Sequence, residues 1–372
     1  MSPASQYDLV VIGGGPAGTA AAIIAGRNGQ RVLLLERGKF PRHKVCGEFV
    51  SAESLALLRS LLDSRHLGLL RDAIQIPNAR LFLDSRTLTT AVDPPAASIA
   101  RLDLDLALWE SAVWAGVDAR QQLTVQSIVG TGPFRVATSA GEFESRAVIN
   151  GSGRWSNLTN LNASPSKAER PERWIGLKAH FAEPCPNPSV DLYFFDGGYC
   201  GVQPVEVNDA PSGNGRVNAC AMVRADVAST LPDLFARHDS LRERSLRWQP
   251  LSDPVSTSPL LFRKPQPERD SILMVGDAAG FVDPFVGDGI SLAVRSGSFA
   301  AECLMPFFAG EISLQRAVQD YCDTYRRKLA PVFRASSTLR RMLVLPRAVR
   351  IPLLFLLSRT PSVGRYLVRK TR

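Results

Sequence analysis

The stretch Tyr7-Asp-Leu-Val-Val-Ile-Gly-Gly-Gly-Pro-Ala-Gly18 decides the fold that we predict for this chain. Its first half is an apolar, β-branched run typical of a buried parallel strand. Glycines at 13, 15 and 18 follow in the spacing GxGxxG, and the small residues 19–25 predict a helix. A second apolar run, residues 31–35, ends at Glu36. Together these segments predict a βαβ unit that binds a dinucleotide.

Each part of this unit has a physical role. Gly13 permits the tight turn, Gly15 lets the backbone approach a pyrophosphate, and Gly18 lets helix and strand pack closely. The helix start offers N–H groups and the positive end of its dipole to phosphates. Glu36 stands where an acid accepts hydrogen bonds from ribose hydroxyls, and its charge disfavours NADP as the bound nucleotide. The pattern alone leaves FAD and NAD open.

A second set of motifs lies near the other end of the chain. The apolar run 272–275 predicts another buried strand, and Gly276-Asp277 follows it directly. Ligands bind at the carboxyl ends of strands in open α/β sheets, so Asp277 is a candidate ligand-binding acid, although a helix N-cap is the alternative. Gly287 and Gly289 open a further helix.

These motifs, in this order, resemble the FAD-dependent aromatic hydroxylase class and, within it, the geranylgeranyl-reductase-like branch. The resemblance covers most of residues 5–310. It implies a doubly wound, Rossmann-like α/β domain that binds FAD, with Asp277 on the ribityl hydroxyls and residues 284–289 against the flavin ring. Arg101-Leu-Asp-Leu-Asp105 with Leu108 matches a family pattern that implies Arg101 near FAD. The predicted cofactor-binding residues are Gly13, Gly15, Gly18, Glu36, Arg37, Arg42, Arg101, Gly276, Asp277, Pro284, Gly287, Gly289 and Ile290.

Residues 40–48, Phe-Pro-Arg-His-Lys-Val-Cys-Gly-Glu, resemble the segment that passes beside the flavin in reductase-like members. The resemblance implies that Cys46 faces flavin or substrate and that Arg42 and Lys44 meet phosphates. Such members usually carry a second glycine where Glu48 stands. Because a buried carboxylate near a flavin can donate a proton, Cys46 and Glu48 are the predicted catalytic residues. The alternatives are a packed thiol and a helix-start acid.

Two further departures from related sequences bear on the substrate. Tyr199 and Gly201 stand where flavin-dependent halogenases carry tryptophans, which argues against a tight halogenation tunnel. Gly201 also opens space where reductases have an indole. Ser152 replaces an aspartate that helps hydroxylases to organise FAD and a transient NADPH, which weakens the case for standard NADPH-driven hydroxylation.

We expect three regions along the chain. Residues 1–75, 100–175 and 260–310 form the FAD-binding domain. Residues 76–99 and 176–259 form a substrate-binding β-sheet domain, with a hairpin loop at 209–215. Residues 311–372 form a basic helical C-terminal region.

The positive charge of the chain is concentrated at its end. The net charge is +9, yet the segment from Thr324 to Arg372 holds 13 Lys or Arg and no acid, and the rest is mildly acidic. The apolar run 351–357 falls far short of the ~20 residues of a membrane span. An anionic membrane surface, packing on the acidic body, and nucleic acid are the alternatives; without an RNA-binding motif we expect no nucleic acid.

Scattered cysteines and no export signal predict a cytoplasmic protein with reduced thiols, possible peripheral attachment to the inner membrane face, and no metal site. The leading functional interpretation is an FAD-dependent oxidoreductase that transfers hydride to a C=C bond of an isoprenoid or polyketide. The alternatives are a monooxygenase of an aromatic or polyketide ring and a non-catalytic flavin-binding membrane-surface protein. Since no second GxGxxG is present, electrons are expected from transiently bound NAD(P)H or a ferredoxin-like partner.

Overall fold

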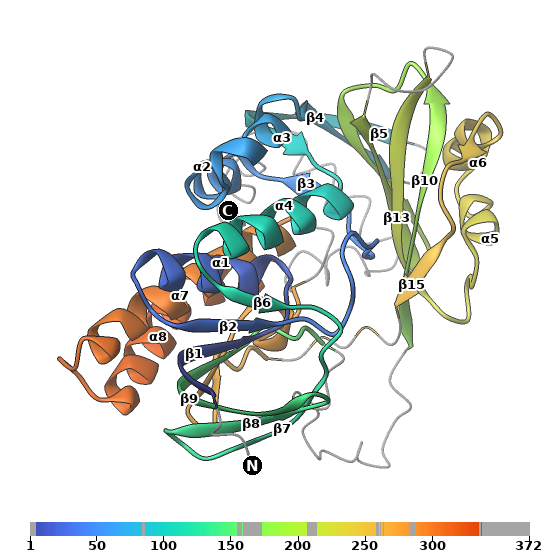
Figure 1. Cartoon of the computed structure of the whole chain (residues 1–372). Coiled ribbons are helices and arrows are strands. Elements are labelled where there is room, and N and C mark those ends of the chain that lie inside the picture. The colour runs from blue at the N-terminus through green and yellow to red at the C-terminus, as the bar shows by residue number, and fades with distance from the viewer. Residues whose placement is uncertain are drawn as a thin grey trace.

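The computed structural model describes residues 5–83, 86–154, 158, 173–206, 214–257, 260, 262, 264–282, 287–334 and 336. These residues form two sheets, with the longer helices packed on the first (Figure 1). Among them, no helix has the length and apolar character that a bilayer crossing requires.

The first sheet contains the glycine motif. Its strand order is β16-β17-β9-β1-β2-β6, and β7 and β8 extend it beside β9. Neighbouring strands from β17 to β6 run parallel. The buried strand β2 and the apolar half of β1 are the two runs that the sequence predicted. The bounds are β1 Ser5–Ile12, β2 Val32–Leu35, β6 Asp118–Arg120, β7 Val125–Val129, β8 Phe134–Thr138, β9 Gly141–Asn150, β16 Glu268–Arg269 and β17 Ile272–Met274.

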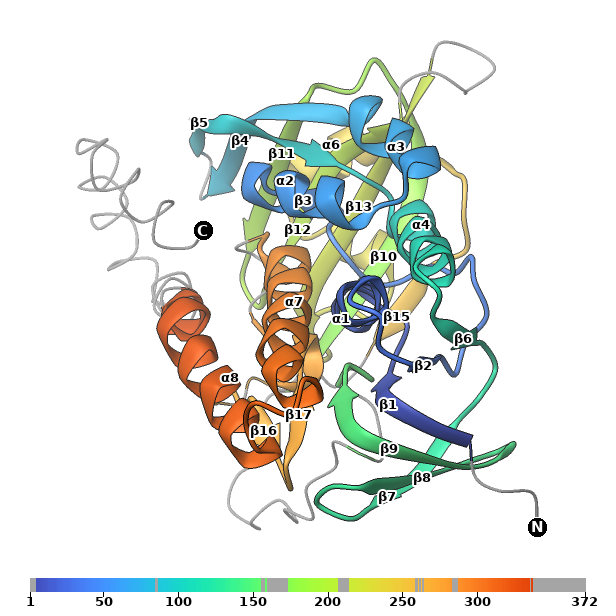
Figure 2. The ribbon, with the colours of Figure 1, turned by 60° about the vertical axis from the view of Figure 1, so that its left-hand side comes forward.

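Three long helices cover one face of this sheet. Helix α1 (Pro16–Arg27) lies between α4 (Arg101–Trp114) and α7 (Gly289–Phe308), as Figure 2 shows. Helices α1 and α7 approach so closely that a Cβ on Gly297 would lie 2.0 Å from the carbonyl oxygen of Ala17. The opposite face packs its apolar side chains against β7 and β8. The mixed α/β fold with a Rossmann-like sheet is thereby confirmed.

Helix α8 (Leu314–Lys328) belongs to the core of this first domain. Tyr321 and Tyr325 are buried on its inner face, and the Tyr321 hydroxyl donates to the carbonyl oxygen of Met274 at 2.7 Å. The start of the expected basic C-terminal region therefore packs on the first sheet. Residues 337–372 lie outside the described part of the chain.

The second sheet, which we name the platform, has the strand order β14-β10-β13-β12-β11-β4-β5-β3, with β15 paired to β10. Its pairs are antiparallel except β11 with β4. Helices α5 (Leu231–Phe235) and α6 (Asp239–Ser245) cover its outer face (Figure 1). The strand bounds are β3 Phe49–Val50, β4 Ile74–Leu83, β5 Arg86–Ser98, β10 Trp174–Pro184, β11 Ser189–Phe195, β12 Gly198–Glu206, β13 Asn214–Arg224, β14 Gln249–Pro250 and β15 Val255–Thr257.

Three short helical elements follow one another between β3 and β4 of the platform, and one turn follows β17 of the first sheet. These are α2 (Ala52–Leu61), α3 (Gly68–Arg71) and the 3-10 turns η1 (Ser64–His66) and η2 (Gly276–Ala278). Antiparallel pairing of β12 with β13 brackets the expected hairpin loop, most of which lies outside the described residues.

Candidate functional site

The glycine loop between β1 and α1 has two packed glycines and one open one. A Cβ on Gly13 would lie 2.3 Å from the Gly151 oxygen, and one on Gly18 would lie 1.9 Å from the Gly13 oxygen. No heavy atom lies within 4 Å of the corresponding position on Gly15. Gly15 is also the N-cap of α1 and supplies no side chain to its first N–H groups. The loop therefore fits a pyrophosphate that approaches Gly15 and the start of α1.

Glu36 fixes the other side of this loop. Its Oε2 accepts a hydrogen bond from the Gly14 N–H at 2.8 Å, and its Oε1 accepts one from the Gly38 N–H at 2.7 Å. The Arg42 guanidinium pairs with the same carboxylate at 3.0 Å, whereas Arg37 is exposed. Glu36 thus lies at the end of β2, beside the start of α1.

The second motif reaches the same helix from the far end of the sequence. Gly276 lies so close to α1 that its Cβ position is 2.9 Å from the Ala17 Cβ. The Asp277 side chain is 39% exposed, and the Arg154 Nε lies 3.7 Å from its Oδ2. Glu36 and Asp277 therefore flank the first turn of α1. Two acids around an open helix start fit an extended dinucleotide such as FAD.

The start of α7 forms the next part of the site. Gly287 has a φ of +75°, and its Cβ position lies 2.9 Å from the Phe49 ring. The space beside Gly289 is open, and Ile290 is buried in the first turn of α7. Pro284 lies outside the described residues. The chain around residue 49 thus meets the helix that is predicted to face the flavin.

Residues 40–48, which we name the flavin loop, lie between this helix and the platform. The Val45 side chain contacts the Gly176 position on β10, where a Cβ would be 2.9 Å away. The Cys46 carbonyl accepts a hydrogen bond from the Asn218 side chain on β13 at 3.0 Å. Arg101 pairs with Asp105 at 2.7 Å and lies beside the Cys46 thiol. The structure therefore brings Cys46 and Arg101 together.

Glu48 ends the flavin loop in a buried cluster of charged groups. Its side chain is fully buried, and its carboxylate meets the Lys178 ammonium and, at 2.8 Å, the His180 Nε2. The same carboxylate accepts a hydrogen bond from the Arg101 backbone N–H at 2.9 Å. Burial acts to raise the pKa of Glu48, but the hydrogen bond from His180 and the charge of Lys178 outweigh it, so the pKa is lowered. We name Glu48, Lys178 and His180 the Glu48 cluster.

This environment bears on the predicted role of Glu48. An ionised carboxylate has no proton to give, so its surroundings disfavour direct proton donation by Glu48 at neutral pH. The role of Cys46 stays a prediction. His43 lies beside the cluster, with its ring centroid 5.6 Å from that of His180, and burial, Lys178 and His180 lower its pKa.

The inner face of the platform divides into a polar and an apolar half. Residues two apart on a strand share a face, so Lys178 and His180 lie on one face of β10. Lys178 is paired with Cys220 on β13, so Met222, two residues further along that strand, lies on the same face. Tyr199 on β12 is paired with Met222 and shares the face as well. Tyr199 and Met222 belong to an apolar cluster. Its buried members are Tyr199, Met222 and Leu260, and the partly buried residues packed against them are Trp174, Leu192, Phe194, Phe262 and Phe281.

Phe281 links this apolar cluster to the FAD site. It lies four residues after Asp277, stacks on Phe262 with ring centroids 5.3 Å apart, and contacts the Arg154 guanidinium at 4.0 Å. An apolar surface therefore borders the acid that is predicted to bind the ribityl chain.

Sequence reasoning missed Lys178, His180 and Asn218. The signal was present as Lys-x-His in an otherwise apolar run, since alternation places both side chains on one face of a strand. It became informative only with the position of Glu48.

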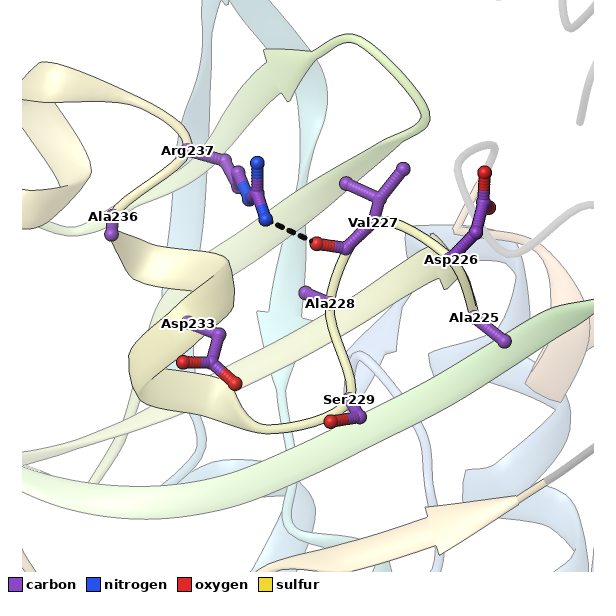
Figure 3. Close-up of a pocket in the computed structure, with 8 residues that line it drawn as sticks. All are labelled: Ala225, Asp226, Val227, Ala228, Ser229, Asp233, Ala236 and Arg237. Atoms are coloured by element: carbon purple, nitrogen blue, oxygen red, sulfur yellow. Dashed lines mark hydrogen bonds between the residues drawn. The ribbon is translucent and has the colours of Figure 1, made fainter.

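A separate cavity lies on the outer side of the platform between β13 and α5 (Figure 3). The Arg237 guanidinium donates to the Val227 carbonyl at its edge at 2.5 Å. The residues that line it are Ala225, Asp226, Val227, Ala228, Ser229, Asp233, Ala236 and Arg237. None of the predicted site residues belongs to this cavity.

Comparisons with known proteins agree with the geometry. The family model described as FAD dependent oxidoreductase matches residues 8–41, from β1 through the flavin loop's first residues. Conditioned medium factor receptor 1 of Dictyostelium discoideum is 25% identical over 90% of this chain and 70% of its own length. Digeranylgeranylglycerophospholipid reductase 1 of Methanococcoides burtonii is 27% identical over 86% and 80%. Menaquinone reductase of Mycobacterium tuberculosis is 27% identical over 82% and 78%.

Solved structures share the fold. A geranylgeranyl bacteriochlorophyll reductase-like protein of Thermoplasma acidophilum has a TM-score of 0.70 at 20% identity, over 92% of this chain and 88% of its own. The flavin-dependent brominase Bmp2 has a TM-score of 0.76 at 20% identity, over 99% and 93%.

The site at the start of α1 and these comparisons define the chain as an FAD-dependent oxidoreductase with FAD as its cofactor. Within that class, it is similar to the geranylgeranyl-reductase-like flavoproteins, which confirms the resemblance drawn from the motifs.

Proposed function

We propose that this oxidoreductase reduces a C=C bond of a lipid-like substrate, with an isoprenoid chain as the first candidate. The observation that carries the proposal is the apolar half of the inner platform face, which continues to Phe281 beside the FAD site. Two of the relatives are named as reductases, one of a digeranylgeranyl lipid and one of menaquinone. An apolar surface of this kind stabilises a hydrocarbon chain by removing it from water.

The chemistry divides between cofactor and chain. Reduced FAD supplies the hydride, and the protein supplies position and electrostatics. Tyr199, Met222 and Phe281 would hold the hydrocarbon, and Gly201 adds no side chain to this surface. The second carbon requires a proton, for which Cys46 remains the predicted donor at the flavin loop.

The decisive experiment uses chemically reduced holoenzyme under argon. We expect reoxidation of the bound flavin when a polyprenyl lipid or menaquinone is added, with a product that stays two mass units heavier after exposure to air, as a quinol would not. Reoxidation only when oxygen is admitted, with uptake matched to product, would overturn the reductase proposal in favour of a monooxygenase.

The electron source and the membrane are the finer parts of the proposal. NAD(P)H that binds transiently, or a ferredoxin-like protein, would reduce the flavin; stopped-flow mixing with each donor separates them.

The basic segment from Thr324 to Arg372 would bring the enzyme to an anionic lipid surface where its substrate lies. Removal of residues 337–372 should abolish sedimentation with phosphatidylglycerol vesicles and leave the flavin spectrum unchanged. Sedimentation that survives the truncation would refute the membrane role of this segment.

A further inference from the structure

The Glu48 cluster joins three parts of the molecule through one buried carboxylate. Glu48 belongs to the flavin loop, Lys178 and His180 to the platform, and the Arg101 N–H to the start of α4. Helix α4 has Ala100 at its N-cap, which offers no side-chain acceptor. The Glu48 carboxylate takes that place and also meets the positive end of the α4 dipole.

The backbone of Glu48 is held in an unusual conformation. Its φ is +63°, in the left-handed region that favours glycine. An acid at such a position needs a compensating contact, and its carboxylate has three donors around it. Its N–H points at the Cys46 Sγ at 3.3 Å, and its carbonyl accepts from the Ile99 N–H at 3.0 Å. Phe49, the next residue, contacts Gly287 before α7.

We infer that Glu48 is a positioning residue: held by Lys178 and His180, it fixes the Cys46 thiol and Arg101 at the FAD site and docks the platform against it. Glu48 lies between Cys46 and Phe49 along the chain, so a shift of its backbone moves both the thiol and the contact with Gly287. The role depends on the FAD site but not on which lipid the enzyme reduces.

Other titratable groups lie near the Glu48 cluster. The flavin loop contributes His43, and α4 contributes Arg101 and Asp103. The strand β13 contributes Arg216 and the buried thiol of Cys220. These groups remain in every variant below, so Glu48→Gln changes only the carboxylate among the charged groups of this region.

The test is the rate at which iodoacetamide alkylates Cys46 in the folded holoenzyme, followed by peptide mapping. Cys185 is exposed and serves as an internal reference. In Glu48→Gln, one amide oxygen replaces two charged acceptors, so we expect alkylation of Cys46 to rise by about tenfold while Cys185 is unchanged. We also expect a shifted visible spectrum of the bound flavin and weaker FAD affinity.

Glu183→Gln is the matched control. Glu183 is a buried, ion-paired acid on the same strand as Lys178, but its partners Arg244, on α6, and Trp248 lie on the outer side of the platform. We expect this variant to lower the melting temperature without changing Cys46 alkylation or the flavin spectrum.

A double variant keeps the test valid if Glu48→Gln does not fold. Glu48→Met with Lys178→Met removes both charges and leaves neither buried alone, so the protein should fold. The Arg101 N–H still loses its acceptor, and we expect fast alkylation of Cys46 again. Wild-type alkylation rates in both Glu48 variants, or an equal increase in Glu183→Gln, would overturn the inference. The alkylation rate of Cys46 can be measured without any lipid substrate. A failure of the proposed C=C reduction can therefore be distinguished from a failure of this inference.

Discussion

At the scale of single residues, Glu36 and Asp277 matter because of where their carboxylates lie. Glu36 already accepts hydrogen bonds from two backbone N–H groups and pairs with Arg42, which fixes its orientation before a ribose arrives. Asp277 is more open and keeps only a longer contact with Arg154. We therefore expect Glu36 to be preorganised and Asp277 to adjust when FAD binds.

Replacement of Glu36 should weaken FAD binding. In Glu36→Gln the charge-assisted hydrogen bonds to the ribose are lost, and at about 1.5–3 kcal/mol the dissociation constant should rise by roughly 10- to 100-fold. Flavin fluorescence quenching measures this constant. Asp8→Asn is the control, since Asp8 pairs with Arg146 and the Arg31 N–H at the opposite end of β1. Equal losses in the two variants would contradict the assignment.

The lowered pKa of Glu48 sets a pH dependence of stability. Its ordinary value is 4.5, and the folded value lies below it. The carboxylate therefore stabilises the fold fully above the unfolded pKa, and this contribution is lost as the pH falls through the folded pKa. We expect the difference in unfolding free energy between wild type and Glu48→Gln to stay constant near neutrality and to shrink below about pH 4.5. Urea titrations of the apoprotein measure it; a difference that widens in acid would refute the argument.

At the scale of elements, the two glycines at the start of α1 have different roles: Gly18 allows close packing, and Gly15 leaves space for a ligand. A methyl group on Gly18 would meet a backbone oxygen at 1.9 Å, whereas one on Gly15 meets nothing in the protein. The two glycines of the same motif thus have different physical reasons for lacking a side chain.

Alanine at these two glycines should give opposite results. Gly18→Ala forces α1 from β1 and should cost about 1–3 kcal/mol of stability. Gly15→Ala should leave the melting temperature of the apoprotein unchanged and impair FAD binding, since its methyl enters the space for the pyrophosphate. Calorimetry and FAD titration of both variants check this, and normal FAD affinity in Gly15→Ala would count against the site.

The sequence predicted elements and motifs better than contacts between domains. The glycine spacing and Glu36 are local patterns with fixed geometry, so the βαβ unit and a bound dinucleotide followed from them, and the choice of FAD followed from the resemblance of all the motifs together. Lys178 and His180 are separated from Glu48 by 130 residues and more, and only the position of the flavin loop in the folded chain shows that they meet. Packing of the basic tail on the body was one of the alternatives from the sequence, but it was argued from charge, whereas α8 packs through its buried tyrosines.

At the scale of the whole molecule, the boundary between the platform and the FAD site has charged side chains around Glu48 and apolar side chains around Phe281. This gradient would orient a substrate whose hydrocarbon part seeks Tyr199 and Met222. Gly201 lies within that surface, and its Cβ position is 3.3 Å from the Leu192 side chain.

An indole at position 201 should block this surface. Gly201→Trp is expected to lower kcat/KM for long-chain substrates by about tenfold or more, because the ring displaces part of the hydrocarbon. FAD affinity should not change, since position 201 lies on β12 rather than on the glycine loop. Steady-state kinetics with substrates of increasing chain length test this prediction. Unchanged kinetics would show that the substrate does not bind on this apolar surface.

The joining of α1 with α7 through Ala17 and Gly297 also has a consequence for biosynthesis. The FAD site uses strand β1 and a helix that is translated more than 270 residues after it. A nascent chain halted at residue 260 lacks Asp277 and α7 altogether, and should therefore leave the ribosome unable to retain flavin. FAD should therefore bind late, only after α7 has been synthesised. Until then, β1 and α1 must stay folded or bound to a chaperone.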